Sequence, residues 1–326
     1  MEKPDFSNIL PKEQLIPILK ELENNTWIEL KKGENVVEYL EKLSSLIAPQ
    51  IGGLTLFFQN YNKGRKWPIF FYRIRATDEI KNRALRSEYS YPPSNIPSHQ
   101  RANLPGYPVF YAADSPGTAL FEVLRMDSYE HNIGKSYCLS VWEMSDEKGF
   151  IFSNLMYDGL PENSPFISFS KYPKDKEPKE FDEWFTNEQK EGFFELMKFY
   201  SRIFQNDTKY VISSFIAHQH LYNLKGPHGF RSDVLIYPSI QLDKNSLNFA
   251  IHPNFVDERL KLRTIYELEF KDVILRHEKP IGSDMTIKNF AVNDYGRIIW
   301  LSRNGSESLF QKRMSEELEG WVQMKK

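Results

Sequence analysis

Apolar residues recur at helical spacing at the start of the chain, in its middle and near its end. Leu15 and Leu19 fall on one helical face, and Leu40 and Leu43 on another, so residues 12–47 should form two helices. Elsewhere short runs rich in aromatic and β-branched residues favour buried strands. Further helices are expected at residues 188–204, 210–222 and from 306 onward, and strands at residues 54–58, 68–74, 109–112, 137–144, 233–237, 247–251, 264–275 and 297–301.

Two irregular stretches separate these elements. The segment 87–108 is rich in Pro, Ser and Asn and predicts a long loop, and such loops in compact domains are usually functional or disordered. Residues 158–186 are rich in Pro, Lys and Glu and are expected to be a surface insertion. Between them a strand, a tight turn and a short helix should follow one another. Ser115 fits the N-cap position of that helix, and Pro116 fits its first helical position.

Composition and charge limit the classes of protein. The 326 residues include 24 Phe, 17 Tyr and 6 Trp, and 40% are hydrophobic, so the chain can bury a sizeable core. The length allows about two domains, or one domain with large insertions. A balance of 42 Lys+Arg against 44 Asp+Glu gives a net charge of −2. Bulk electrostatics therefore favour neither a nucleic-acid partner nor an anionic membrane surface.

The single cysteine, Cys138, excludes an intrachain disulfide and any metal site built from several thiolates. The N-terminal residues lack the apolar stretch of a signal peptide, and no window reaches the length of a membrane span. We therefore expect a cytoplasmic protein without membrane partners.

The common catalytic motifs are missing from the sequence. It contains no G-x-G-x-x-G, no G-x-x-x-x-G-K-[ST], no H-E-x-x-H and no G-x-S-x-G. His218 and His220 are two positions apart on a predicted helix, so their side chains point in different directions and cannot share one ion. We expect these histidines to face solvent or the edge of the core, and we predict no metal site.

A set of polar residues within or beside the predicted strands needs another explanation. Arg73 lies in the run IFFYRI, and Glu122 lies among apolar neighbours on the short helix. A charged group in such surroundings is costly unless it is paired or binds a ligand. One interpretation is an internal Arg73–Glu122 ion pair. Tyr111 is either an ordinary strand aromatic or a site residue, and Ser239 is either a turn or cap residue or part of a site.

These residues also carry a family resemblance. The stretch RANLPGYPVFYAADSPGTALFEV, from Arg101 to Val123, resembles the core of the RES domain family: an Arg, a strand ending in Tyr, a small turn, and then Ala-x-x-Glu. A later block resembles the family's next helix, its strand ending in Tyr-Pro-Ser and an Asn-containing strand. That block comprises residues 210–222, SDVLIYPS and NFAI. The resemblance covers about residues 65–275.

The resemblance implies an α+β, ADP-ribosyltransferase-like mixed-sheet core with helices, and an enzyme that cleaves the nicotinamide–ribose bond of NAD without a metal. Arg73 and Arg101 would hold the pyrophosphate, and Tyr111 would stack on the nicotinamide or its ribose. Glu122 would act at the nicotinamide ribose, and Ser239 would complete the pocket. Arg101 and Tyr111 count with Glu122 as candidate catalytic residues. Some family members are toxins neutralised by a helix-turn-helix antitoxin.

The chemistry suits these residue types. Cleavage of the nicotinamide–ribose bond passes through an oxocarbenium-like transition state, which a carboxylate beside the ribose can stabilise. Two guanidiniums can clamp a pyrophosphate without a metal ion. The acceptor of ADP-ribose stays open between water, phosphate and a macromolecule, and self-association also stays open.

Two other functions compete with this one. The first is a non-catalytic module that binds NAD, ADP-ribose or a protein on the same scaffold. The second, weaker one is nucleic-acid binding by the basic stretch 73–86. In domain terms we expect one catalytic core at residues 65–275 with the 158–186 insertion, a helical N-terminal appendage at residues 1–60, and a C-terminal extension at residues 276–326 packed on the core.

Overall fold

The computed structural model divides the chain into two compact units. The first unit comprises residues 1–60, 94–108 and 151–238, and the second comprises residues 61–93, 109–150 and 239–326. The structure describes residues 9–52, 58–61, 70–96, 98–124, 129–144, 149–167, 185–223, 231–242, 244–276, 279–294 and 296–324.

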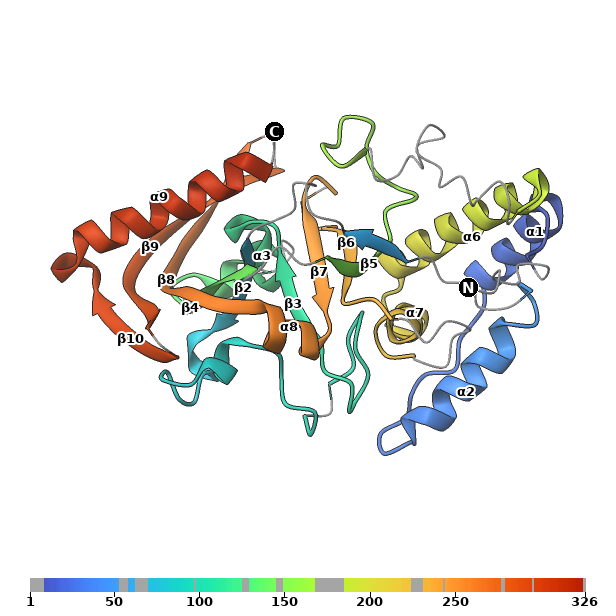
Figure 1. The fold of residues 1–326 in the computed structure, drawn as a ribbon, viewed down its shortest axis with the longest axis horizontal. Coiled ribbons are helices and arrows are strands. Elements are labelled where there is room, and N and C mark those ends of the chain that lie inside the picture. Colours follow the sequence, from blue (N-terminus) through green and yellow to red (C-terminus); the bar gives the residue numbers. More distant parts are fainter. Residues whose placement is uncertain are drawn as a thin grey trace. The chain divides into compact units, whose positions relative to one another are not determined.

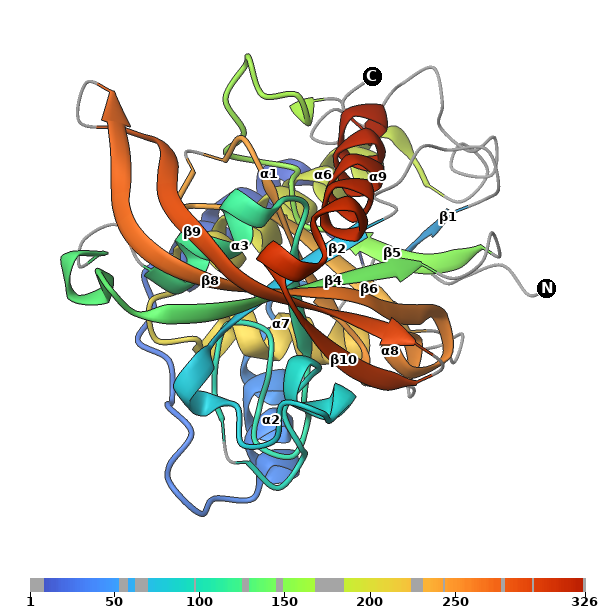
Figure 2. The same ribbon diagram turned by 90° about the vertical axis from the view of Figure 1, so that its left-hand side faces the viewer.

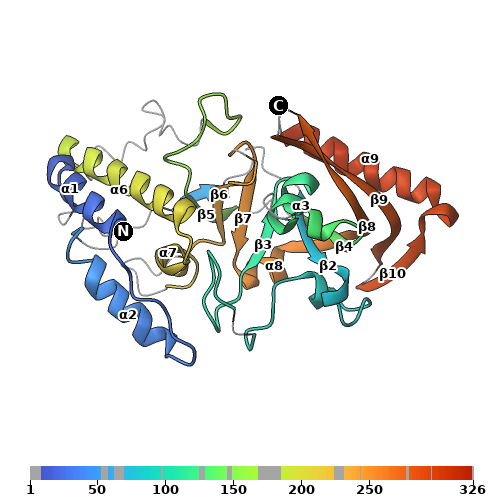
Figure 3. The same ribbon diagram turned by 180° about the vertical axis from the view of Figure 1, so that it is seen from behind.

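The first unit is mainly helical. The long helix α6 begins with a capping box, in which Thr186 and Gln189 each satisfy the other's backbone N–H. Helix α1 runs beside α6, as Figures 1 and 3 show. A side chain at Gly192 of α6 would clash with the carbonyl group of Leu10, so glycine permits this close approach. The helices are α1 (Lys12–Glu23), α2 (Val36–Ile47), α6 (Asn187–Asn206) and α7 (Val211–Leu221).

Three strands belong to this unit: β1 (Gln59–Tyr61), β5 (Phe150–Asn154) and β6 (Val234–Pro238). Their order is β1-β5-β6, and β5 is parallel to β6 with Phe152 opposite Val234. Every residue of β6 is buried, as its continuous apolar sequence predicts.

The second unit is built on antiparallel strands in the order β7-β3-β2-β4-β8-β9-β10. Figure 2 shows β8 and β9 side by side as a long hairpin. The strands are β2 (Phe70–Ala76), β3 (Phe110–Ala113), β4 (Ser136–Met144), β7 (Leu247–Ile251), β8 (Leu260–Arg276), β9 (Lys279–Asp294) and β10 (Arg297–Ser302). The helices are α3 (Pro116–Leu124), α8 (Pro253–Arg259) and α9 (Glu307–Met324).

One apolar cluster of the second unit lies on the face of this sheet that α3 covers. Alternate residues of β2, namely Phe70, Tyr72 and Ile74, pack with Leu120 of α3 and Phe310 of α9. Burial of these large apolar side chains, each contributing about 1.5–3 kcal/mol, holds α3 on the sheet. Because α3 carries Glu122, the same packing fixes the position of that residue.

Most sequence predictions of local structure are confirmed. The protein is α+β, and helices and strands form close to most of the predicted ranges. Strands β5 and β9 and helix α8 were not predicted. The predicted strand 54–58 lies almost entirely outside the described residues, as do residues 168–184 of the predicted insertion. The predicted domain boundaries stay a prediction.

Candidate active site

A tight turn places α3 directly after β3. The Ser115 side chain accepts a hydrogen bond from the backbone N–H of Thr118 at 3.1 Å, which confirms the predicted N-cap. The Thr118 hydroxyl donates to the carboxylate of Asp114 at 2.9 Å, and both residues are buried. The backbone N–H of Asp114 donates to Leu247 on β7. These bonds fix the direction in which α3 leaves the sheet.

Glu122, on the last turns of α3, accepts two hydrogen bonds from the second unit. The Ser239 hydroxyl donates to Oε1 at 2.5 Å, and the Asn248 side-chain amide donates to the same oxygen at 2.8 Å. Ser239 and Asn248 are buried, whereas Glu122 is exposed. We call these three residues the Glu122 cluster.

The geometry of the Glu122 cluster leaves one carboxylate oxygen available. Both donors use Oε1, and no donor to Oε2 is present among the described residues. Both donors are also uncharged, so they orient the carboxylate and leave its negative charge in place, which a Lys or Arg partner would neutralise. An exposed, oriented carboxylate with a free oxygen can accept a hydrogen bond from a ligand hydroxyl and stabilise a developing positive charge.

Ser239 is held by its own backbone. Its N–H donates to the carbonyl of Ser246 and its carbonyl accepts from Lys244, both at 2.8 Å. Lys244 has φ 61, a left-handed conformation that tightens the connection to β7. Ser239 is therefore a turn residue, as one interpretation predicted, and its side chain also contacts Glu122.

Tyr111 lies on the same face of the sheet as Asn248. The register pairs Tyr111 with Ala250 and Ala113 with Asn248, and paired residues in an antiparallel sheet share a face. The sequence-predicted residues Tyr111, Glu122 and Ser239 are thus gathered on one side of the second unit. Tyr111 is partly buried.

Arg73 points to the opposite face of the sheet. It alternates with Tyr72 and Ile74, and its guanidinium lies 5.5 Å from the centre of the Phe110 ring. One nitrogen donates to the carbonyl of Tyr111 at 3.0 Å, while Nε is buried and finds no hydrogen-bond partner in the part of the chain that the structure describes. Burial, with the nearby charge of Arg75, lowers the pKa of Arg73 to about 10, so it stays charged at neutral pH.

The alternative of an Arg73–Glu122 ion pair is not supported. Within the described part of the second unit, Arg73 forms no ion pair with a carboxylate, and Glu122 is bonded to Ser239 and Asn248 instead. Glu122 lies on the exposed face of α3, a helix in which Leu120 and Leu124 are buried but Val123 and Glu122 are exposed. A helix on the surface of a sheet buries one face only.

Arg101 belongs to the first unit, where it binds the C-terminal end of α6. Its guanidinium donates to the carbonyls of Phe204 and Gln205, the latter at 2.9 Å. It also lies 5.3 Å from the centre of the Tyr210 ring. A cation at a helix C-terminus satisfies free carbonyls and interacts favourably with the helix dipole. These contacts give Arg101 a structural role, and its predicted anion-binding role stays a prediction.

The basic stretch that suggested nucleic-acid binding is engaged in contacts within the second unit. Arg83 bonds to Glu267 at 2.8 Å and lies 3.8 Å from the centre of the Trp300 ring. Arg86 donates to two backbone carbonyls near α8, and Arg75 donates to the carbonyl of Glu88. These contacts tie the loop after β2 to the rest of the unit.

The two α7 histidines also differ from expectation. His220 is 1% exposed, and its Nδ1 lies 2.8 Å from the hydroxyl of Ser153, which contacts the hydroxyl of Ser232. Its Nε2 has no hydrogen-bond partner among the described residues. Burial lowers the pKa of His220 to about 3 and that of His218 to about 4, so both are neutral at pH 7. We call His220, Ser153 and Ser232 the His220 cluster.

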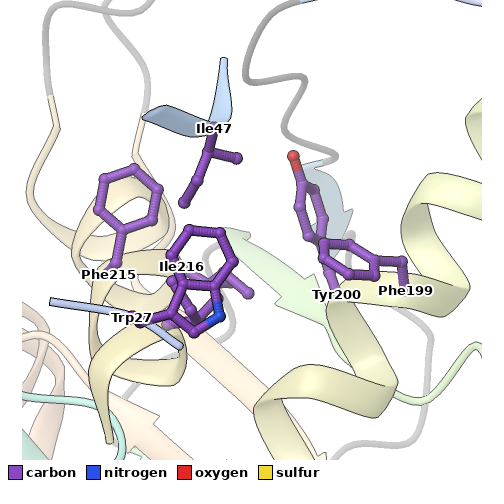
Figure 4. Close-up of a pocket in the computed structure, with 7 residues that line it drawn as sticks. Trp27, Ile47, Phe199, Tyr200, Phe215 and Ile216 are labelled. Atoms are coloured by element: carbon purple, nitrogen blue, oxygen red, sulfur yellow. The ribbon is translucent and has the colours of Figure 1, made fainter. Parts of the chain in front are cut away.

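An apolar pocket in the first unit carries none of the predicted site residues (Figure 4). Trp27, from the segment before α2, and aromatic residues of α6 and α7 line it. The hydroxyl of Tyr200 is buried without a partner, and burial raises its pKa above the ordinary value. The pocket lining is Trp27, Ile47, Phe199, Tyr200, Ile212, Phe215 and Ile216.

Asn248 was not predicted as a site residue. A signal for it exists in the sequence, because Asn248 is the one polar residue in the run LNFAI, and a polar side chain in a buried strand needs a hydrogen-bond partner. Which partner it finds depends on the register of β7 against β3, which the sequence does not specify.

The fold and the Glu122 cluster define an α+β protein with an oriented, exposed carboxylate. A model of the RES domain family matches residues 70–144, so the predicted resemblance to that family is confirmed over this segment. The segment contains Arg73, Arg101, Tyr111 and Glu122, while Ser239 and Asn248 lie beyond it. No curated protein and no solved structure gave a significant match.

The described residues hold no group of three or more His, Cys, Asp or Glu side chains arranged to bind a metal ion. None of their helices combines the length and the apolar character that crossing a bilayer requires.

Proposed function

We propose that this protein consumes NAD by cleaving the nicotinamide–ribose bond, with Glu122 as the catalytic carboxylate. The observation that carries the proposal is the Glu122 cluster: two buried neutral donors hold Oε1 of an exposed glutamate, and Glu122 lies in the segment that resembles the RES domain family.

The reaction needs little beyond such a carboxylate. As the C–N bond breaks, nicotinamide leaves as a neutral base with the bonding electron pair, and positive charge develops on the ribose. Oε2 of Glu122 accepts a hydrogen bond from a hydroxyl of that ribose and stabilises this charge. An acceptor then attacks the ribose carbon; when the acceptor is water, the products are ADP-ribose, nicotinamide and one proton. The positively charged nicotinamide ring of NAD is a good leaving group, so no metal is required.

Tyr111 is proposed to contact the nicotinamide end of NAD. It shares the sheet face of Asn248 and is partly exposed, and an aromatic ring offers a flat surface for the nicotinamide ring. Replacement of Tyr111 by Ala is expected to raise the KM for NAD by about tenfold or to lower kcat, and replacement by Phe should retain most activity, because stacking needs the ring and not the hydroxyl.

The pyrophosphate role of Arg73 and Arg101 stays a prediction, and the proposal does not depend on it. Arg73→Ala should raise the KM for NAD by about tenfold or more if the guanidinium binds phosphate, because a charge-assisted contact is then lost. An unchanged KM together with lower stability would assign Arg73 to supporting the β3 backbone instead.

The proposal is tested by incubating the purified protein with NAD and measuring nicotinamide release by chromatography. Parallel reactions contain buffer only, inorganic phosphate, or an acceptor protein, because the acceptor is open. Release in any of them, lost in Glu122→Gln and kept in the exposed helix-α8 control Glu258→Gln, supports the proposal. No release in all three contradicts it. Stabilisation by ADP-ribose without turnover would favour the non-catalytic binding module.

A toxin role is the finer form of this proposal. If the protein depletes NAD in cells, its expression should stop growth and lower cellular NAD, and Glu122→Gln should do neither at equal protein levels. An antitoxin, a protein acceptor and self-association stay predictions of the family resemblance or of the sequence.

A further inference from the structure

Asn248 is a buried polar residue in an otherwise apolar strand. It lies on β7 between Leu247 and Phe249, is 4% exposed, and each of its strand neighbours is buried. Burying an amide without a hydrogen-bond partner costs free energy, so its position requires a partner. That partner is Glu122.

The register of the sheet explains how a strand residue reaches a helix carboxylate. Asn248 pairs with Ala113, the last residue of β3, directly before the turn into α3. The β3–α3 turn, fixed by the hydrogen bonds of Asp114, Ser115 and Thr118, brings Glu122 within hydrogen-bond distance of Asn248. The Asn248 amide then donates to Oε1 at 2.8 Å, beside the Ser239 bond.

The chemical nature of this donor matters. A Lys or Arg at position 248 would form an ion pair and reduce the negative charge that a cationic transition state requires. An amide fixes the carboxylate in one orientation without changing its charge. Two donors on one oxygen define the rotation of the carboxyl group better than one donor does, and this rotation decides where Oε2 points.

We infer that Asn248 is a positioning residue for Glu122, which directs Oε2 toward the nicotinamide ribose. The inference rests on the proposed NAD cleavage. It predicts that Asn248 acts on the rate of bond cleavage through Glu122 and has little effect on the binding of NAD.

The experiment compares wild type, Asn248→Ala, Asn248→Asp and the exposed helix-α8 control Asn254→Ala. Steady-state nicotinamide release gives kcat and KM, and thermal unfolding reports stability for each variant. Asn248→Ala should lower kcat by about tenfold to a hundredfold, the effect of one hydrogen bond to a charged group, and change KM by less than about threefold. Asn254→Ala should match wild type.

Asn248→Asp keeps the shape of the side chain, removes its donor and places a second carboxylate against Glu122. It should lose at least as much kcat as Asn248→Ala, and it serves as the test if the alanine variant does not fold. A purely structural role would lower the stability of both variants and leave the kcat of the folded fraction unchanged.

The outcomes separate the inference from the proposed function. An active wild-type protein with wild-type kcat in the folded Asn248 variants overturns the inference alone. A tenfold to hundredfold rise of KM with unchanged kcat also overturns the inference, because such a result assigns Asn248 to substrate binding. If wild type releases no nicotinamide under any acceptor condition, the proposed function fails and this inference fails with it.

Discussion

Two clusters of polar side chains in this protein resemble each other in size and differ in surroundings. The Glu122 cluster in the second unit joins a helix carboxylate to a serine and an asparagine, and Glu122 itself is exposed. The His220 cluster in the first unit joins a helix imidazole to two serines, and all its members are buried.

The two clusters differ in whether the group that can carry a charge is buried or exposed. In the His220 cluster the ring is neutral, and the described residues that surround it leave it 1% exposed. It can stabilise the fold only by satisfying polar groups in the core. In the Glu122 cluster the buried members are the donors, and the charged acceptor faces outward. That arrangement orients a reactive group while leaving it accessible.

The largest expected effect comes from Glu122→Gln. Because the amide is uncharged but still offers an oxygen to both donors, we expect kcat for nicotinamide release to fall by about a thousandfold. The free energy of unfolding should change by less than about 0.5 kcal/mol, as for other exposed positions. Chromatographic assay and chemical denaturation measure the two quantities. A large loss of stability that accompanies the loss of activity would instead assign Glu122 a structural role like that of His220.

The next largest effect is expected in the His220 cluster, where a substitution should lower stability and leave activity unchanged. His220→Leu removes the imidazole partner of the Ser153 hydroxyl, which itself contacts Ser232, so we expect the free energy of unfolding to fall by about 2–3 kcal/mol. The kcat of the folded protein should stay within about twofold of wild type. The exposed His131→Leu serves as the control. A hundredfold loss of kcat in stable His220→Leu protein would contradict the assignment of this cluster to structure.

The pH dependence of stability should also come partly from His220. Burial lowers its folded pKa to about 3, whereas an unfolded histidine titrates near 6.5, so protons bind preferentially to the unfolded chain between these values. Stability from this group is complete above about pH 6.5 and is lost as the pH falls toward 3, by roughly 2 kcal/mol at pH 5. His220→Gln should reduce this slope in thermal unfolding between pH 7 and pH 5. An unchanged slope would mean that another group titrates.

The smallest effects are expected from substitution of one serine in each cluster, Ser239 and Ser232. Ser239→Ala removes one of the two donors to Glu122 and should lower kcat by about tenfold with a small loss of stability. Ser232→Ala, at a similarly buried position, should lower stability by about 1 kcal/mol and leave kcat unchanged. Parallel assays and melts of the two variants compare them. If both change kcat equally, the clusters are not functionally distinct.

Local patterns predicted much of the fold. Helical spacing of apolar residues found α1, α2, α6 and α7, and the cap at Ser115 located the start of α3 within a residue. Strand β9 was missed because Pro280 and Gly282 and its many polar residues obscure alternation, and bulges interrupt its pairing with β8. The seven-residue helix α8 is too short for a periodic signal.

The candidate site could be predicted only in part. Glu122 and Ser239 came from residue type, position and family resemblance, and their contact joins residues 117 positions apart. The partner of Asn248, and the placement of Arg73 on the sheet face opposite Tyr111, follow from strand register, which short-range patterns do not fix. The same holds for Arg101, since its binding to the end of α6 depends on tertiary packing.

The central claim, that Oε2 of Glu122 meets the nicotinamide ribose, is tested most directly by a crystal structure of Glu122→Gln bound to NAD. This variant should be too slow to consume its substrate. The account predicts intact NAD with a hydroxyl of the nicotinamide ribose about 3 Å from the side chain at position 122, and with Ser239 and Asn248 still donating to that side chain. NAD bound with its nicotinamide ribose away from position 122 would contradict the account.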